Sequence, residues 1–185
     1  AVVTGMLLGM NLPPTINPLY GVIGSFVAIG IAKQLFGGIG QNFANPAIVG
    51  RIVLMLSFTA SMSTWCKPFY YLSGADVVTG ATPLVSKDAD YLSLLLGTTG
   101  GCIGETCAIA LIAGGIYLIA ARIITPHAPA AFIGTVFLLT LIAGDDPIYA
   151  VLSGGLIIGA FFMATDYATT PLTGKGKVIF GIGCG

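Results

Sequence analysis

The stretch DVVTGATPLVSK, residues 76–87, places two threonines, a glycine and a proline in a chain otherwise dominated by apolar residues. Pro83 disfavours the helical conformation for Thr82, and Gly80 lets the backbone bend. We therefore expect the Thr82 hydroxyl on an extended, accessible segment, where another enzyme could modify it. On spacing alone, an ordinary loop in which a threonine hydroxyl bonds its own backbone is the simpler interpretation.

The composition predicts an integral membrane protein. Only 8% of the residues are charged, against about 25% in a soluble domain, and the mean hydropathy is +0.97. Seven basic and seven acidic residues cannot supply the charged surface that a soluble chain of 185 residues needs. The net charge of zero indicates no nucleic-acid partner, and one histidine with four scattered cysteines predicts no metal site.

Two asparagines lie in a second unusual stretch, FGGIGQNFANPA at residues 36–47, between two apolar runs. Irregular backbone at membrane depth must be buried in protein or line a cavity, because lipid satisfies none of its polar groups. The amides of Asn42 and Asn45 could bind a cation through their oxygens. Capping of a re-entrant turn explains both residues equally well.

Two carboxylates complete the set of candidates for an ion path. Glu105 lies in a glycine-rich break, and Asp166 ends an apolar run. An ionisable residue at membrane depth is a functional candidate by default. The structural alternatives are an acid beside a helix N-terminus for Glu105, and a backbone cap or a partner of Lys175 for Asp166. We therefore take Asn42, Asn45, Glu105 and Asp166 as ion-path candidates.

Apolar runs separated by Pro, Gly and charge predict an all-α, polytopic helix bundle with re-entrant breaks, forming one transmembrane domain over residues 1–185. The predicted segments are residues 1–12, 19–35, 47–64, 106–124, 131–143, 149–165 and 178–185, with a half-helix at 91–96. The first and last are too short to cross a bilayer, which takes about 20 residues. We therefore expect a fragment of a longer chain.

The charge distribution predicts how the chain lies in the membrane. Counting crossings puts loop 65–90 on one side, and the other side carries Lys33, Arg122, His127, Lys175 and Lys177. Because positive charge favours the cytoplasm, the loop with the threonines is predicted to face outside.

Two internal sequence matches are alternative signs of a structural repeat. NPLYGVIGSFVAIG from Asn17 matches DPIYAVLSGGLIIG from Asp146, and TGMLLG from Thr4 matches GGLIIG from Gly154. The first match has more identities, but it pairs helices four apart, which run in the same direction. The second pairs helices five apart, which run in opposite directions. Because inverted repeats with broken helices are a common transporter plan, we favour the second.

TGATPL, residues 79–84, resembles the flavinylation motif of one protein family. The family contains the D subunit of the Rnf ion-translocating ferredoxin:NAD oxidoreductase and the B subunit of the Na+-translocating NADH:quinone reductase. Further stretches resemble it in the expected order: IAKQLFGGIGQNFANPA, GGCIGETCAIALIAGGIYLI, GAFFMATD and GKGKVIFGIGCG. The short loop and the GGCIGETCA stretch look more like the Rnf D subunit.

This resemblance implies a flavoprotein subunit of an electron-transfer complex that moves Na+ or H+. Thr82 would carry FMN through a phosphoester bond, within the motif that Thr79, Gly80 and Ala81 complete. The resemblance further implies a prokaryotic inner-membrane location, iron-sulfur and flavin subunits as partners, and ten helices in two inverted halves, as in urea transporters. This chain would then lack two helices before Ala1 and about one after Gly185.

Two other functions fit parts of the same pattern. A urea-transporter-type channel or permease shares the fold and the re-entrant breaks, but it has no need of the TGAT loop. A degenerate structural subunit without a cofactor is the third hypothesis. The sequence leaves open the choice between Na+ and H+, and the presence of a second, noncovalent flavin such as riboflavin.

Overall fold

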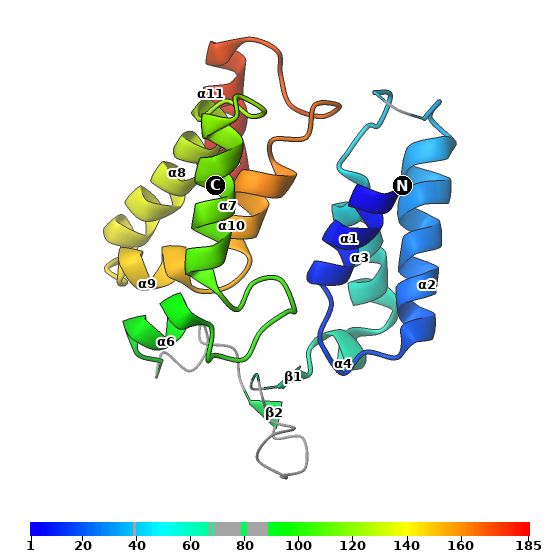
Figure 1. Ribbon diagram of the computed structural model, residues 1–185, viewed down its shortest axis with the longest axis horizontal. Coiled ribbons are helices and arrows are strands. Elements are labelled where there is room, and N and C mark those ends of the chain that lie inside the picture. Colours follow the sequence, from blue (N-terminus) through cyan, green and yellow to red (C-terminus); the bar gives the residue numbers. More distant parts are fainter. Residues whose placement is uncertain (39, 67, 69–78, 81–88) are drawn as a thin grey trace.

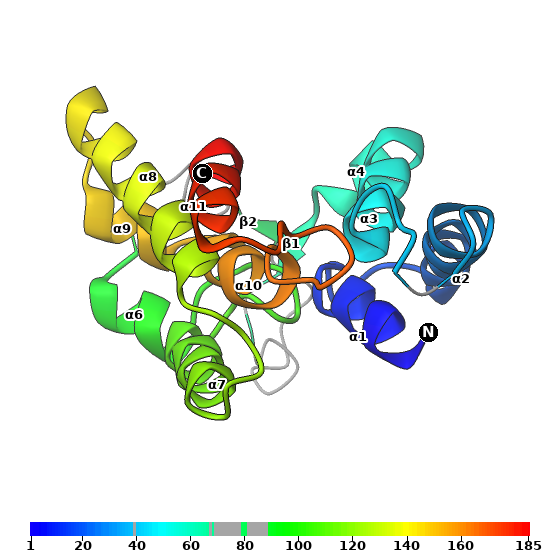
Figure 2. The same ribbon diagram turned by 90° about the horizontal axis from the view of Figure 1, so that it is seen from above.

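The chain folds into two groups of helices that lie side by side (Figure 1). The computed structural model describes residues 1–38, 40–66, 68, 79–80 and 89–185. The N-terminal lobe holds α1 to α4 and the C-terminal lobe holds α6 to α11. Seen from above, α1 and α10 lie where the two lobes face each other (Figure 2).

The N-terminal lobe follows the first three predicted apolar runs. Its elements are α1 (Val2–Met10), α2 (Pro18–Phe26), the π-helix η1 (Val27–Gln34), α3 (Pro46–Ser57) and α4 (Thr59–Met62). η1 continues α2 without a gap, so the run predicted at 19–35 is one continuous helix that changes from α-helical to π-helical winding. Phe58 separates α3 from α4, which divides the run predicted at 47–64.

The C-terminal lobe is more interrupted than the sequence predicts. Its helices are α6 (Tyr91–Leu96), α7 (Ala108–Ala120), α8 (His127–Ala143), α9 (Pro147–Leu152), α10 (Leu156–Ile158), the π-helix η3 (Gly159–Met163) and α11 (Gly174–Cys184). α6 matches the predicted half-helix at 91–96. The run predicted at 149–165 is broken between α9 and α10. α11 begins earlier than predicted, because Thr173 Oγ1 accepts the N–H of Gly176 at 3.2 Å and caps the helix.

Three helices begin with the same Asx-Pro pair, in which the Asx side chain caps the helix and proline takes the first position. The side chains of Asn17, Asn45 and Asp146 accept the backbone N–H two residues further on, at 3.0, 3.0 and 3.1 Å. The sequence match between NPLY and DPIY is therefore a shared capping signature, which needs no repeat to explain it.

Two short strands pair where the threonine motif begins. β1 (Trp65–Cys66) pairs antiparallel with β2 (Thr79–Gly80), with Trp65 opposite Gly80 and Cys66 opposite Thr79. The first two residues of the TGAT motif therefore lie in a defined backbone position beside the N-terminal lobe.

Glycines let the helices of each lobe approach closely. A Cβ at Gly50 of α3 would lie 2.8 Å from the backbone oxygen of Gly24 in α2, and a Cβ at Gly115 of α7 would lie 2.5 Å from the ring of Phe161 in η3. Close packing of this kind, with small residues at helix contacts, is typical of helices in membranes.

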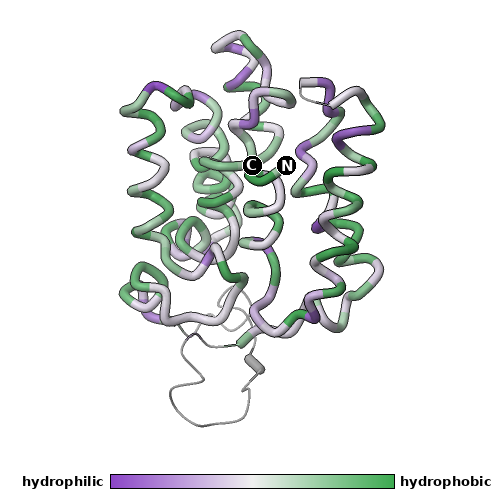
Figure 3. Tube along the Cα trace, turned by 45° about the vertical axis from the view of Figure 1, so that its right-hand side comes forward, coloured by the Kyte–Doolittle hydropathy of each residue, from purple (hydrophilic) through white to green (hydrophobic). Residues whose placement is uncertain are grey.

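The outer faces of both lobes are apolar, and hydrophilic residues concentrate near the ends of the helices (Figure 3). Leu56 of α3 is 79% exposed and Ile142 of α8 is 80% exposed. Within the part of the chain that the structure describes, no helix combines the length and the hydropathy needed to cross a bilayer. The polar and charged helix ends lie at two opposite ends of the molecule, with β1 and β2 at one and the start of α11 at the other (Figure 1).

We predict that Gly50→Ala lowers the free energy of unfolding by about 1–3 kcal/mol, because the added methyl meets backbone that cannot move without separating α2 from α3. Thermal unfolding of the detergent-solubilised protein measures this. Gly134→Ala in α8 is the matched control, since a Cβ there meets nothing within 4 Å. Equal melting temperatures for the two variants would show that the close approach of α2 and α3 contributes no stability.

Candidate functional site

The structure brings three of the four ion-path candidates together. Asn42, Asn45 and Asp166 line one cavity of about 130 Å³ at the boundary between the lobes. Its wall is completed by Val3, Thr4, Leu7, Lys33, Pro46, Phe162 and Thr165. We call it the Asn42–Asp166 cavity. Residues far apart in the sequence thus meet at one polar site.

The two asparagines differ in how their amides are used. Asn45 is 9% exposed, and its Oδ1 caps α3 by accepting the N–H of Ala47 at 3.0 Å. Its Nδ2 donates to the backbone oxygen of Met163 at 3.1 Å, across the lobe boundary. Asn42 Oδ1 is buried and has no hydrogen-bond partner among the residues that the structure describes. Asn45 therefore holds the two lobes together, whereas Asn42 keeps an acceptor available for a ligand.

A π-helix runs into each irregular segment that borders this cavity. η1 ends at Gln34, just before residues 35–45, and η3 ends at Met163, just before residues 164–173. π-helical turns occur frequently at functional sites because the extra residue leaves backbone groups out of the regular ladder. The breaks predicted from Gly, Asn and Pro are thus preceded by a second irregularity that the sequence did not reveal.

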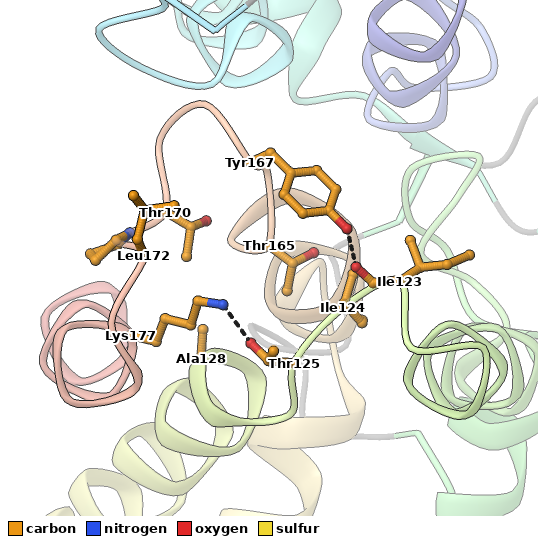
Figure 4. Close-up of a pocket in the computed structure, with 10 residues that line it drawn as sticks. Ile123, Ile124, Thr125, Ala128, Thr165, Tyr167, Thr170, Leu172 and Lys177 are labelled. Atoms are coloured by element: carbon orange, nitrogen blue, oxygen red, sulfur yellow. Dashed lines mark hydrogen bonds between the residues drawn. The ribbon is translucent and has the colours of Figure 1, made fainter.

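The segment that carries Asp166 is tied to the turn between α7 and α8. The Tyr167 hydroxyl donates to the backbone oxygen of Ile123, and Lys177 Nζ of α11 donates to Thr125 Oγ1 in the same turn at 2.9 Å (Figure 4). The backbone oxygen of Asp166 accepts the hydroxyl of Thr170 at 2.7 Å. The contacts of Tyr167 and Thr170 hold the segment 164–173, from which Asp166 lines the cavity.

Glu105 lines a different cavity, of about 310 Å³, together with Arg51. We call it the Arg51–Glu105 cavity. Its wall combines residues of the N-terminal lobe, such as Trp65, with the glycine-rich segments of the C-terminal lobe, including Gly155. A carboxylate, a guanidinium and exposed backbone give this cavity a mixed polar character.

Arg51 and Glu105 belong to one hydrogen-bonded group. Arg51 Nη1 donates to Asn11 Oδ1 at 2.7 Å, and its Nη2 lies 3.7 Å from Cys102 Sγ. The backbone N–H of Cys102 donates to Glu105 Oε1 at 2.8 Å. The same glycine-rich segment bonds the end of α1, since Gly104 N donates to the oxygen of Met10 at 2.7 Å. The group therefore spans both lobes.

The two cavities use different parts of α3, and a buried apolar cluster lies near them. Pro46 at the start of α3 lines the Asn42–Asp166 cavity, and Arg51 in the middle of the helix lines the other. Side chains of α1, η1, α3 and η3 form a buried cluster of Leu8, Ala28, Ala47 and Met163. We infer that this cluster is an apolar seal between the two cavities.

A third cavity, of about 420 Å³, lies at the end of α8 and the start of α6 and α9. The Tyr91 hydroxyl donates to Asp146 Oδ2 there, and the rings of Tyr91 and Tyr149 meet edge to face at 6.3 Å. The hydrogen bond from Tyr91 holds the pKa of Asp146 below its usual range. Both oxygens of this carboxylate accept hydrogen bonds, because Oδ1 also accepts the N–H of Ile148 and caps α9.

The threonine motif is only partly described. Thr79 and Gly80 form β2, so their backbone position is known. Ala81 and Thr82 lie outside the described residues. The expected extended position of the Thr82 hydroxyl remains a prediction.

Sequence reasoning missed two residues of the hydrogen-bonded group at the Arg51–Glu105 cavity, Arg51 and Asn11. Arg51 is the only charged residue in the apolar run 47–64, and that isolation was the available signal. Asn11 is 1% exposed and lies at the end of α1. Its role depends on a contact with Arg51 across 40 residues of sequence, which no local pattern indicates.

Comparison with known proteins identifies what kind of chain carries this arrangement. The family described as NQR2, RnfD, RnfE matches residues 1–185. The chain is 46% identical over 207 residues to the D subunit of a proton-translocating ferredoxin:NAD(+) oxidoreductase complex from Clostridium ljungdahlii. It is also 46% identical over 194 residues to the D subunit of a Na(+)-translocating complex of the same activity from Acetobacterium woodii. It is 38% identical over 224 residues to the D subunit of an ion-translocating oxidoreductase complex from Rhodobacter capsulatus.

These alignments cover all of this chain and 62%, 60% and 63% of the three relatives, in that order. The chain thus spans about three-fifths of the length of the curated relatives it matches. Its fold is that of a helical protein with broken helices at a lobe boundary. The chain belongs to the NQR2, RnfD, RnfE family, and the resemblance drawn from its sequence motifs is confirmed.

We predict that Asn45→Ala destabilises the protein more than Asn17→Ala. Both variants lose a helix cap, at about 1 kcal/mol each. Asn45→Ala also removes the hydrogen bond to the oxygen of Met163, which then keeps only the N–H of Asp166 at 3.4 Å, at about 1 kcal/mol more. Asn17 is exposed and only caps α2, so it is the matched control. Equal losses in thermal stability would contradict the assigned contact between the lobes.

Proposed function

We propose that this chain is part of a membrane subunit of a redox-driven ion translocase, in which ferredoxin:NAD oxidoreductase chemistry drives the movement of Na+ or H+. The observation that carries the proposal is the pair of cavities that hold amide and ionisable side chains, with the buried apolar cluster that we infer to lie between them, in a chain whose relatives are named for ion translocation. The partners would be the other subunits of the complex, both membrane-bound and peripheral, with iron-sulfur and flavin groups.

The surface supports a place in the inner membrane of a prokaryote. Apolar side chains such as Leu56 and Ile142 are four-fifths exposed, which favours contact with lipid or with other membrane subunits. In the proposed orientation, β1, β2 and the Arg51–Glu105 cavity face outside. The end of the molecule with Lys33 and the start of α11 then faces the cytoplasm, in accord with the positive-inside rule. An inverted, urea-transporter-like repeat is part of this proposal, with α1 and α10 as corresponding helices.

The ion path would pass through both cavities. Asn42 and Asp166 would offer an amide oxygen and a carboxylate on the cytoplasmic side, and Glu105 a carboxylate on the outer side. The buried Asn42 Oδ1, which has no partner in the described part of the chain, supports a ligand role there. The buried cluster around Leu8 and Met163 would have to open for an ion to cross.

Covalent attachment of FMN to Thr82 is the second part of the proposal. Its support is the TGAT sequence of residues 79–82, found in a member of this family and anchored by the pairing of β2 with β1. When bound, FMN would supply one-electron transfer. The chain's own contribution would be to hold the attachment point at the outer surface, close to Trp65. A second, noncovalent flavin such as riboflavin would be counted by cofactor analysis of the same protein.

We predict that Thr82→Ala abolishes covalent flavin and that Thr79→Ala does not, because the acceptor hydroxyl is that of Thr82. The proteins are made in a host that contains the flavin-transferring enzyme, denatured, and examined on a gel for flavin fluorescence. The Thr79 variant is the control for the loop. Absence of fluorescence from the unmodified protein would refute the flavin proposal and favour a channel or a structural subunit.

We predict that Glu105→Gln reduces ion translocation by the complex more than it reduces flavin content, since it removes the carboxylate but leaves the loop with Thr82 intact. Translocation into vesicles and flavin fluorescence are measured on the same preparation. Asp90→Asn is the matched control, because Asp90 is exposed and lies outside both cavities. Undiminished pumping by the Glu105 variant would remove this residue from the path.

A further inference from the structure

The Arg51–Glu105 cavity contains a fixed positive charge beside the carboxylate assigned to the ion path. Arg51 is the sole charged residue of α3, and Glu105 is the only glutamate in the chain. They come from different lobes and line the same space of about 310 Å³. A cation that approaches this carboxylate must therefore also approach the guanidinium.

Gly155 is where the two charged groups converge. Glu105 Oε2 lies 2.8 Å, and Arg51 Nη1 3.8 Å, from the position that a Cβ at residue 155 would take. The absence of a side chain at Gly155 thus leaves room for Oε2 in the cavity. Any larger residue would push this oxygen aside.

Both groups are held in place by other contacts. Arg51 donates to Asn11 at 2.7 Å, and Asn11 is 1% exposed, so the guanidinium is fixed by a buried, charge-assisted hydrogen bond. Glu105 is fixed through Oε1, which accepts the N–H of Cys102. Its other oxygen, Oε2, is left to face the cavity. Cys102 links the two charges, since its sulfur also lies 3.7 Å from Arg51 Nη2.

We propose that this cavity is a monovalent-cation site in which Glu105 Oε2 is the charged ligand and Arg51 is a built-in competing cation. The inference rests on the proposed ion path and assigns Arg51 a positioning role within it. A carboxylate in a partly dehydrated cavity attracts a cation strongly, whereas a fixed guanidinium a few ångströms away repels it. The balance gives weak binding, which an ion needs in order to leave the site again.

The test measures binding of radioactive sodium ion to the purified, assembled complex by scintillation proximity, without turnover. Arg51→Gln removes the competing charge, so we expect it to bind Na+ about tenfold more tightly, a change of about 1.4 kcal/mol. Arg51→Lys keeps the charge and should bind Na+ with nearly the affinity of the unmodified complex. In the double variant that combines Arg51→Gln with Glu105→Gln, we expect no increase in Na+ affinity.

The outcome that overturns the proposal is an assembled Arg51→Gln complex with full flavin content whose Na+ affinity equals that of the unmodified complex, or the absence of Na+ binding to both. Gly155→Ala covers the case in which Arg51→Gln fails to assemble. It keeps both charges but displaces Oε2, so we expect several-fold weaker Na+ binding. Unchanged Na+ binding by this variant also overturns the proposal. Absence of flavin or of electron transfer in the unmodified complex would instead refute the proposed function.

Discussion

The lobe boundary depends on how interrupted helices satisfy the backbone groups that their breaks leave without partners. A break in a helix frees N–H and carbonyl groups, and lipid cannot bond them. Here each lobe donates a hydrogen bond to a backbone oxygen at the broken helix of the other lobe. Asn45 of the N-terminal lobe donates to the oxygen of Met163 at the end of η3, and Gly104 of the C-terminal lobe donates to the oxygen of Met10 at the end of α1. The breaks are therefore the places where the two lobes join.

This constraint explains why the polar residues gather where they do. The segments that contain breaks carry Asn42, Glu105 and Asp166, and joining the breaks brings these side chains to the boundary. The uninterrupted parts of the helices between the breaks contribute apolar residues, which form the seal around Leu8 and Met163. Two polar cavities with an apolar contact between them follow from the same packing. Ion movement in the proposed function would use this arrangement, and electron transfer would use the loop beside β1.

Much of the fold could be predicted because its signals are local. The apolar runs, the half-helix at 91–96 and the polar breaks are visible in the sequence, and the Asx-Pro pairs at Asn17, Asn45 and Asp146 explain three helix starts. The division of the run 149–165 into α9, α10 and η3 was not predicted, because glycine occurs inside the helices of this chain as well as in its turns. The π-helical windings also leave no signature in composition.

The candidate site could be predicted only in part. Chemical type alone selected Asn42, Asn45, Glu105 and Asp166, and the structure groups three of them. It also shows that Asn45 is occupied in capping α3 and joining the lobes. The division of the candidates into two cavities could not be predicted, because it depends on contacts between residues more than a hundred positions apart. The role of Arg51 depends on its contacts with Asn11 at the end of α1 and with Cys102 in the glycine-rich segment before α7.

The central claim is that the two cavities open to opposite sides of the membrane and are closed from each other. Single cysteines at Thr99, in the Arg51–Glu105 cavity, and at Thr165, in the Asn42–Asp166 cavity, test it most directly in a complex whose copy of this chain carries no other cysteine. The label on this chain is read after its separation from the other subunits on a gel. In sealed vesicles of known orientation, a membrane-impermeant thiol reagent should label Thr99→Cys only from outside and Thr165→Cys only from the cytoplasmic side. Labelling of both positions from the same side would contradict the account.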